Sequence, residues 1–396
     1  MSLNGTPAAE RAHIGFFGVR NAGKSSLVNA VTGQAMSIVS DIKGTTTDAV
    51  QKTMELLPIG PVVIIDTPGF DDSGELGDLR VERAKQVLRK TDIAVLVVDA
   101  SAGMSDTDRE LIKLFGDTPY IIAYNKSDLM DTEKGKAENG IFVSAKTGEN
   151  IYELKEKIAQ LTFERTEKRV AADLVKKGDT VVLIIPIDES APKGRIILPQ
   201  QLVLRDLLDA NCKVICVKPD EITDMLETLK TPPELVITDS QAFGEVSKKV
   251  PESIKLTSFS ILLARYKGVL PLLTEGAAKL KALKDGDTVL ISEGCTHHRQ
   301  CNDIGTVKLP GWIKEFSGAS PDFEFTSGGE FPNDLSKYAL VLHCGGCMLG
   351  EKEMQSRMTR AKESGVPIVN YGIAIAAMNG ILYRSLSPFP ELQKTV

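Results

Sequence analysis

The chain has 396 residues, of which 42% are hydrophobic and 25% charged, a composition typical of globular rather than disordered or low-complexity proteins. At about 150 residues per domain, this length predicts two or three domains. No apolar segment reaches the ~18–20 residues that cross a bilayer, and residues 1–13 lack a secretory signal pattern, so we expect a cytoplasmic protein without a membrane partner. A net charge of −6 argues against a nucleic-acid partner, because non-specific binding of that kind depends on a basic surface.

The first 165 residues alternate short apolar segments with helical ones. This alternation predicts a parallel α/β sheet that helices cover on both faces. The expected strands are His13–Phe17, Val62–Asp66, Ile93–Asp99, Pro119–Tyr124 and Gly140–Ser144, and the expected helices are Leu79–Lys90, Asp106–Phe115 and Asn150–Leu161.

The rest of the chain predicts two smaller α/β domains with parallel sheets, after a charged stretch, Glu164–Lys177, that we expect to be a linker or a solvated helix. The middle domain is expected to have strands at Thr180–Ile187, Lys213–Val217 and Leu235–Thr238, and helices at Gln200–Ala210 and Asp220–Leu229. The last domain, from near Tyr266, is expected to have strands at Thr288–Ser292, Tyr338–His343 and Pro367–Asn370. Residues 178–184 and 286–292 read GDTVVLI and GDTVLIS, so a duplication is one hypothesis for these two domains.

A phosphate-binding motif follows the first predicted strand. Its sequence is G-x-x-x-x-G-K-S between a strand and a helix, formed by Gly18, Gly23, Lys24 and Ser25. In such a loop, backbone N–H groups and the helix N-terminus surround the β-phosphate, the lysine contacts the β- and γ-phosphate oxygens, and the serine hydroxyl ligates Mg²⁺. We expect the remaining nucleotide contacts of the loop to come from Asn21, Ala22 and Ser26.

Three further motifs follow predicted strands in the order of a guanine-nucleotide site. Asp66-Thr67-Pro68-Gly69 supplies a carboxylate that holds Mg²⁺ through water and a Gly69 N–H that senses the γ-phosphate. Asn125-Lys126-Ser127-Asp128 supplies a carboxylate for the N1–H and N2 amine of guanine, which adenine cannot replace. Ser144-Ala145-Lys146 supplies a loop for the guanine carbonyl. Together the four motifs predict a GTP-binding domain.

With these motifs, residues 14–161 resemble a Ras-type GTPase of the branch that serves tRNA modification and ribosome assembly. The resemblance identifies Gly44-Thr45-Thr46 and Asp48 as the switch I motif G-T-T-x-D. It implies that Thr46 joins Ser25 and Asp66 around Mg²⁺ in the GTP state. The implied catalytic set is Lys24, Thr46, Asp66 and Gly69.

Two positions bear on the rate of GTP hydrolysis to GDP and phosphate. Phe70 stands where Ras-like enzymes carry the glutamine that orients water, so we expect slow intrinsic hydrolysis, on the order of 10⁻⁴ s⁻¹. Asn21 stands where this branch places a potassium-binding asparagine, so we expect K⁺ to stimulate hydrolysis more than Na⁺. The alternative is that Asn21 only caps or solvates the loop.

Cysteine and histidine are concentrated late in the chain, where four of the six Cys and three of the four His lie between Cys295 and Cys347. Cys295 and His297 follow one predicted strand, and the His-Cys-Gly-Gly-Cys sequence 343–347 follows another, so both should lie at the carboxyl ends of parallel strands. The two glycines of the sequence 343–347 should let backbone N–H groups come close to the cysteine sulfurs. Three thiolates and one further ligand fit either tetrahedral Zn²⁺ or a [4Fe–4S] cluster with an exchangeable iron, and spacing does not decide between them. Of the remaining cysteines, we expect Cys212 and Cys216 to lie in the core. Cys301 is expected to be a spare ligand or an oxidation-prone thiol.

The whole chain resembles the HydF family, the scaffold and carrier maturases of [FeFe]-hydrogenase, because a GTPase domain precedes Cys-x-His and His-Cys-x-x-Cys elements. The resemblance implies a GTP-binding domain at 1–165, a dimerisation domain at 166–265 and a cluster-binding domain at 266–396. It also implies that a [4Fe–4S] cluster is ligated by Cys295, Cys344 and Cys347, with His297 or His343 as a candidate further ligand.

By the same resemblance, the chain is a homodimer or a larger self-assembly that carries a diiron precursor with CO, cyanide and dithiolate ligands. Its other implied partners are two radical-SAM maturases and the apo-hydrogenase that receives the precursor. The alternative from another class is a ribosome- or tRNA-associated GTPase with a structural zinc module. That protein would contain zinc and a basic RNA-facing domain.

Overall fold

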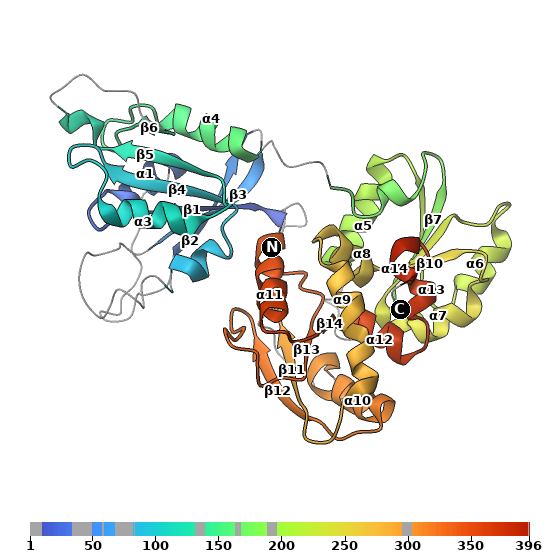
Figure 1. The fold of residues 1–396 in the computed structure, drawn as a ribbon. Helices are drawn as coiled ribbons and strands as arrows, with labels where there is room; N and C mark the ends of the chain where they lie inside the picture. The colour runs from blue at the N-terminus through green and yellow to red at the C-terminus, as the bar shows by residue number, and fades with distance from the viewer. Residues whose placement is uncertain are drawn as a thin grey trace. The chain divides into compact units, whose positions relative to one another are not determined.

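The structure is a computed structural model of the chain, and it describes residues 10–33, 50–57, 59–67, 82, 84–130, 139–162, 168–187, 196–294, 303–394 and 396. Two compact units divide the chain, Met1–Thr166 and Glu167–Val396, hereafter unit 1 and unit 2. Both contain sheets that are wholly or mainly parallel, with helices between the strands, which confirms the predicted α/β class (Figure 1). Among the described residues, no helix has both the length and the apolar character to cross a membrane.

Unit 1 is built on a six-stranded sheet, within the described residues, of order β2-β3-β1-β4-β5-β6. Strand β2 pairs antiparallel with β3, and the other pairs are parallel. Its strands are β1 (Ala12–Phe17), β2 (Val50–Leu56), β3 (Gly60–Asp66), β4 (Ile93–Asp99), β5 (Tyr120–Asn125) and β6 (Gly140–Phe142), and its helices are α1 (Lys24–Thr32), α3 (Asp106–Phe115) and α4 (Ile151–Thr162). The sequence analysis missed β2, because this edge strand mixes polar with apolar residues.

Helices cover both faces of this sheet because successive strand residues point to opposite sides. On β4, Val95 and Val97 pack in one cluster with residues of α1 and α4. Ala94 and Leu96 pack in another cluster with residues of α3. The central strands are therefore apolar throughout, and their carboxyl ends meet at one edge of the sheet.

Unit 2 contains two four-stranded parallel sheets, ordered β10-β9-β7-β8 and β12-β11-β13-β14. The first consists of β7 (Thr180–Ile184), β8 (Lys213–Val217), β9 (Leu235–Thr238) and β10 (Lys255–Ser258), and the second of β11 (Thr288–Glu293), β12 (Asp322–Ser327), β13 (Leu340–His343) and β14 (Ile368–Asn370). The helices are α5 (Leu198–Asp209), α6 (Ile222–Thr228), α7 (Phe243–Lys249), α8 (Phe259–Tyr266), α9 (Leu270–Ala277), α10 (Leu309–Ser317), α11 (Glu351–Glu363), α12 (Tyr371–Met378), α13 (Leu382–Ser385) and α14 (Pro390–Gln393), with a π-helical turn at Ile304–Lys308.

The two sheets of unit 2 have the same topology: the first strand of each is central, the second lies on one side of it, and the third and fourth lie on the other. The turns before the first strands also match. The Asp179 carboxylate accepts the Lys176 N–H at 2.7 Å, and the Asp287 carboxylate accepts the Lys284 N–H at 3.0 Å. Shared topology and shared turn contacts support the duplication hypothesis that the two GDTV sequences suggested.

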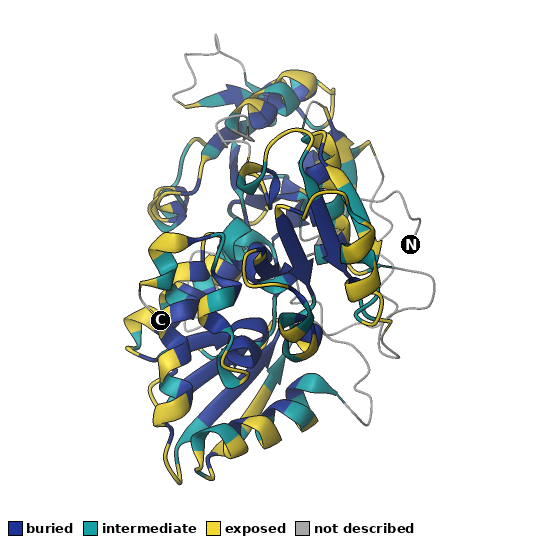
Figure 2. Ribbon diagram, turned by 90° about the vertical axis from the view of Figure 1, so that its right-hand side faces the viewer, coloured by how far each residue is buried: buried dark blue, intermediate teal, exposed yellow. Residues whose placement is uncertain are grey.

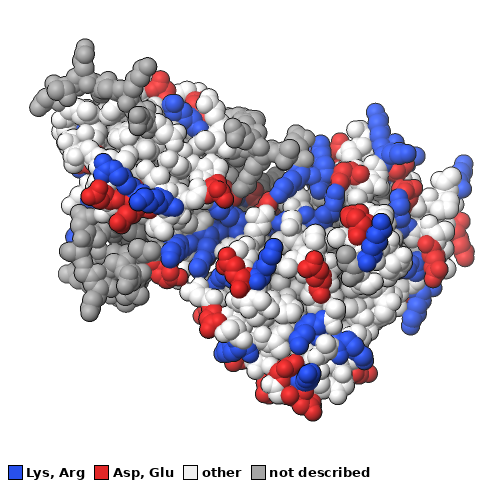
Figure 3. Space-filling model, in the orientation of Figure 1, with Lys and Arg blue, Asp and Glu red and all other residues white. Residues whose placement is uncertain are grey.

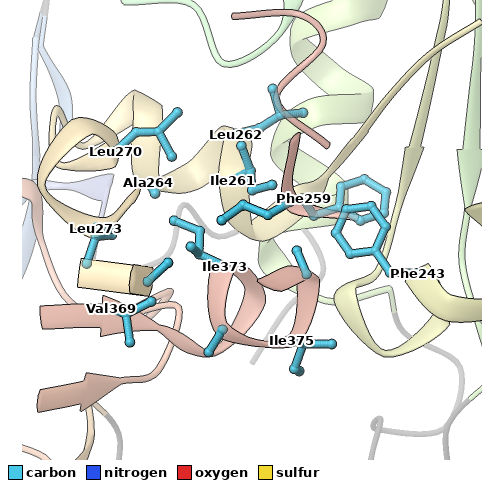
Figure 4. Close-up of a cluster of buried hydrophobic side chains, with 14 of the residues drawn as sticks. Phe243, Phe259, Ile261, Leu262, Ala264, Leu270, Leu273, Val369, Ile373 and Ile375 are labelled. Carbon is cyan, nitrogen blue, oxygen red and sulfur yellow. The ribbon is translucent and has the colours of Figure 1, made fainter. Parts of the chain in front are cut away.

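The two sheets of unit 2 share one hydrophobic core. Residues from both belong to a single buried cluster, and Figure 4 shows α8 residues Phe259 and Ile261 beside Ile373 of α12. The chain after β14 also reaches the first sheet, where the Ser387 hydroxyl accepts the Leu256 N–H at 3.1 Å. The strands of the sheets are largely buried, and exposed residues gather on helices and loops (Figure 2).

Three expectations for unit 2 need correction. The stretch Glu164–Lys177 was expected to be a linker or a solvated helix, but in its described part, 168–177, residues 170–172 are buried and their N–H groups bond the Asp206 carboxylate at 2.8–2.9 Å. Cys212 is buried, but Cys216 is exposed because β8 is an edge strand. Strands β10 and β12 were missed, since one has four residues and the other is a partly exposed edge.

Candidate functional site

The phosphate loop of unit 1 connects β1 to α1. Gly18 and Gly23 have φ angles of 146° and 87°, which favour glycine, and a Cβ at Gly23 would overlap the Asn125 amide. Lys24 is 7% exposed, and its ammonium donates to the carbonyl oxygens of Gly18 and Val19 at 3.0 and 3.1 Å. The loop therefore wraps around the lysine, as a phosphate cradle requires.

A hydroxyl and a carboxylate beside this loop fit a magnesium ion. The Ser25 hydroxyl donates to Asp66 Oδ2 at 2.7 Å, while Asp66 Oδ1 is buried without a hydrogen-bond partner. Burial raises the pKa of Asp66, and the Ser25 hydrogen bond and the Lys24 charge oppose this rise. A divalent cation with oxygen ligands would satisfy the buried oxygen and favour the charged carboxylate.

The guanine motifs meet at the carboxyl ends of β5 and β6. Asn125 joins three segments, because its Nδ2 donates to the Ala22 carbonyl at 3.1 Å and its Oδ1 accepts the Ala145 N–H at 3.0 Å. The Ser144 hydroxyl donates to Asp128 at 2.6 Å and orients that exposed carboxylate. The predicted base-recognition residues and the phosphate loop thus form one connected site.

Sequence reasoning missed two supports of this site. Asp99 pairs with the Lys126 ammonium at 2.6 Å, and Glu149 accepts the Ser127 hydroxyl at 2.8 Å. The position of Asp99 at the end of a predicted strand was the available signal. Three other predicted residues of the nucleotide site are exposed, namely Asn21, Ser26 and Lys146. The predicted positions outside the described residues are Gly44, Thr45, Thr46, Asp48, Pro68, Gly69 and Phe70.

A cysteine loop, residues 343–349, lies at the carboxyl end of β13 in unit 2. Strands β11 and β13 pair so that Ser292 is opposite His343. The Cys344 Sγ accepts the N–H groups of Gly294 and Gly346 at 3.0 and 3.3 Å. The chain that leads into Cys295 is thereby tied to Cys344, while Cys295, His297 and Cys301 lie outside the described residues.

His343 is fully buried, and both of its ring nitrogens have partners. Its Nδ1 lies 2.7 Å from the Cys344 carbonyl oxygen, and its Nε2 lies 3.0 Å from an amino nitrogen of Arg357. Burial and, second to it, the positive charge of Arg357 lower the pKa of His343 to about 3. The neutral ring therefore donates from Nδ1 to the carbonyl and accepts at Nε2 from the guanidinium.

Two buried cations, both missed by the sequence analysis, hold the cysteine loop. Arg357 is 1% exposed, and it also donates to Gly328 O at 2.6 Å and Glu353 at 2.9 Å. Lys267 is 4% exposed, and its ammonium donates to the carbonyls of Gly346 and Leu349. Neither carried a sequence signal, because a lone cation on a helix or after one usually faces solvent.

The thiols of this loop suit a bound metal centre. Burial raises the pKa of the Cys344 thiol, and the Gly294 and Gly346 N–H groups oppose that rise. Coordination to a metal would remove the thiol proton, and the two N–H groups would then donate hydrogen bonds to the thiolate sulfur. Within the described residues no three metal-ligating side chains gather, and the remaining predicted cysteine ligand, Cys295, lies outside them.

Sequence models of known families match three successive parts of the chain. Residues 13–126 match a 50S ribosome-binding GTPase, residues 170–268 the hydrogen maturase F dimerization domain, and residues 271–388 the hydrogen maturase F tetramerization domain. The two maturase domains carry names that describe self-association. Their matches meet near Lys267, between α8 and α9.

Curated relatives match the GTPase part. The tRNA modification GTPase MnmE of Streptococcus pneumoniae is 37% identical over 147 residues, which are 36% of this chain and 32% of that protein. The MnmE of Clostridioides difficile is 32% identical over 206 residues, which are 50% of this chain and 44% of that protein. The chain thus spans less than half the length of these relatives.

Among solved structures, Era of Aquifex aeolicus is similar at 21% identity and a TM-score of 0.34, covering 52% of this chain and 94% of that one. A probable GTP-binding protein engB is similar at 29% identity and a TM-score of 0.32, covering 39% of this chain and all of that one. A P-loop GTPase domain is followed by both maturase domains, which together span residues 170–268 and 271–388. The chain therefore belongs to the hydrogen maturase F family.

Proposed function

We propose that this chain is a hydrogenase-maturation GTPase that binds Mg²⁺ and GTP in unit 1 and a [4Fe–4S] cluster in unit 2. The cluster thiolates are those of Cys295, Cys344 and Cys347, and one iron stays exchangeable. The observation that carries the cluster assignment is the pair of N–H groups, from Gly294 and Gly346, that converge on Cys344 Sγ. They join the two sequence elements that contain the cysteines.

The exchangeable iron explains how the protein can act as a carrier. If Cys295, Cys344 and Cys347 alone hold the cluster, one iron would stay open to a ligand of the diiron precursor and could release it, whereas a fourth protein ligand would compete with that cargo. His343 is a poor fourth ligand, since its ring nitrogens already contact the Cys344 carbonyl and Arg357. Its role in the proposal is to hold the loop. His297, outside the described residues, remains a candidate.

GTP hydrolysis regulates contacts with other proteins in this proposal and does not drive the iron chemistry. The γ-phosphate orders the switch segments, and its loss releases them. The partners are two radical-SAM maturases and the apo-hydrogenase, and the protein associates with itself. Asn21 binds K⁺ at the phosphate loop, so equal hydrolysis rates in K⁺ and Na⁺ would remove this part of the proposal.

A zinc-containing GTPase that acts on RNA would need a basic surface. On the face in Figure 3, acidic side chains lie among the basic ones over unit 2, and the whole chain carries a net charge of −6. Charges of both signs side by side give little of the attraction on which phosphate-backbone binding depends. We therefore favour the maturase function.

Anaerobic reconstitution with iron and sulfide tests the proposal. Metal analysis and EPR after reduction should report a [4Fe–4S] cluster whose signal changes when imidazole or cyanide is added. Cys344→Ser should reduce the iron content, whereas the matched control Cys212→Ser, at a buried thiol just before β8, should keep it. Zinc in place of iron, or iron content that is independent of Cys344, would refute the cluster assignment.

A further inference from the structure

Lys267 joins the helical part of unit 2 to the cysteine loop. It follows α8 and lies before α9, and its N–H donates to the Leu263 carbonyl at 3.0 Å. Its ammonium donates to the carbonyl oxygens of Gly346 and, at 2.7 Å, Leu349. In the sequence these two residues flank Cys347, so one side chain holds the backbone before and after a predicted cluster ligand.

The Lys267 ammonium is buried beside the predicted cluster loop. Lys267 is 4% exposed, so water and salt screen its positive charge only weakly. A centre of three thiolates and a cluster core is anionic, and it becomes more so when the cluster is reduced.

We propose that Lys267 is a positioning residue of the metal centre, which holds the loop around Cys347 and stabilises the reduced, more anionic state of the cluster. The proposal rests on the proposed function of this loop as a [4Fe–4S] site. The Lys267 ammonium bonds the carbonyl oxygens of Gly346 and Leu349, so its positive charge lies beside the backbone that carries Cys347. The potential of such a cluster depends on nearby charge and on hydrogen bonds.

A second contact is made by the backbone of Lys267. The Gln355 amide, on α11, lies 3.4 Å from the Lys267 carbonyl oxygen. Residues from α8 and α11 are thus linked to the carbonyls around Cys347 through one lysine. A change in the packing of α8 would therefore reach the cluster loop through Lys267.

Redox titration of the reconstituted full chain tests whether the Lys267 charge stabilises the reduced cluster. Lys267→Gln should lower the ratio of reduced to oxidised cluster at a fixed potential about tenfold, or ~59 mV for one electron. Lys267→Arg should keep the wild-type potential. The matched control is Lys281→Gln, since Lys281 also donates to a carbonyl, that of Phe316 at 2.8 Å, but on the surface. A Lys267→Gln cluster with the wild-type potential would overturn the charge role.

Amide hydrogen exchange on the metal-free protein tests the positioning. Exchange in residues 344–349 should be faster in Lys267→Gln and unchanged in Lys281→Gln. Wild-type exchange in Lys267→Gln would refute the positioning role. If the wild-type chain takes up no cluster, the proposed function and the redox role fail together, while exchange still decides whether Lys267 holds the loop.

Discussion

Replacing Arg357 by methionine removes a guanidinium that is 1% exposed and that joins three segments around the cysteine loop. The lost contacts are those to His343 Nε2 at 3.0 Å, Gly328 O at 2.6 Å and Glu353 at 2.9 Å. Methionine refills much of the apolar space beside Phe331, whose ring centre lies 5.2 Å from the guanidinium carbon. The variant therefore removes mainly the polar contacts.

The expected loss in the free energy of unfolding follows from the Glu353 carboxylate, which stays mostly buried in the variant. The Glu353 carboxylate is 14% exposed and would lose its buried partner. Breaking a buried ion pair by removing one partner costs about 3–5 kcal/mol. The matched control is Arg205→Met, because Arg205 pairs with Asp209 four residues along an exposed helix face, with 78% and 44% of the two side chains exposed. Such surface pairs contribute about 0.3–0.5 kcal/mol.

Urea unfolding followed by tryptophan fluorescence measures this difference. The chain has one tryptophan, Trp312, and it lies on α10 in the same unit. With an m-value of about 3 kcal/mol/M, Arg357→Met should lower the unfolding midpoint by about 1–1.7 M. The double variant Arg357→Met/Glu353→Gln should recover part of the loss, since no unpaired carboxylate is left. A midpoint shift as small as that of Arg205→Met would refute the reasoning.

Three further outcomes are expected. Asp128→Asn should weaken GTP binding about 10–100-fold, because a hydrogen bond to a charged group contributes about 1.5–3 kcal/mol. A titration with fluorescent GTP measures this affinity, and an unchanged affinity would contradict the role assigned to Asp128. Asp206→Ala should destabilise unit 2 by about 2–4 kcal/mol in the urea assay, because three N–H groups lose their charged acceptor, and a loss no larger than that of Arg205→Met would count against it. Gly276→Ala should destabilise unit 2 by about 1–3 kcal/mol, because its Cβ would overlap the Ile368 carbonyl. Gly311→Ala, in a helix with open space around the added carbon, should instead stabilise it by about 0.5–1 kcal/mol, and equal effects of the two alanines would contradict this account.

Much of the nucleotide site could be predicted because its signals are local. A loop between a strand and a helix needs glycines at Gly18 and Gly23, and these are visible without any long-range contact. Asn125 could be predicted as a nucleotide-site residue in the same way, because it follows a predicted strand and begins the Asn-Lys-Ser-Asp motif. Its contacts with Ala22 and Ala145 could not be predicted, because they join residues 103 and 20 positions apart.

The edges of the sheets were predicted less well. Buried central strands such as β4 and β11 are apolar throughout and stand out in the sequence. Strand β12 is partly exposed, and β10 has only four residues, so neither has a distinct pattern. The core assignment of Cys216 failed for the same reason, since nothing local marks β8 as an edge.

The sequence by itself determined the GTPase motifs, the order of the α/β parts and the two thiols of the cysteine loop, because each depends on residues close together in the chain. Only the tertiary structure brought Gly294 to Cys344, buried Arg357 against His343 and carried Lys267 into the loop. These contacts join residues 50, 14 and 79 positions apart. The physical reason is that a cation becomes buried through packing between elements, and packing of that kind leaves no local pattern in the sequence.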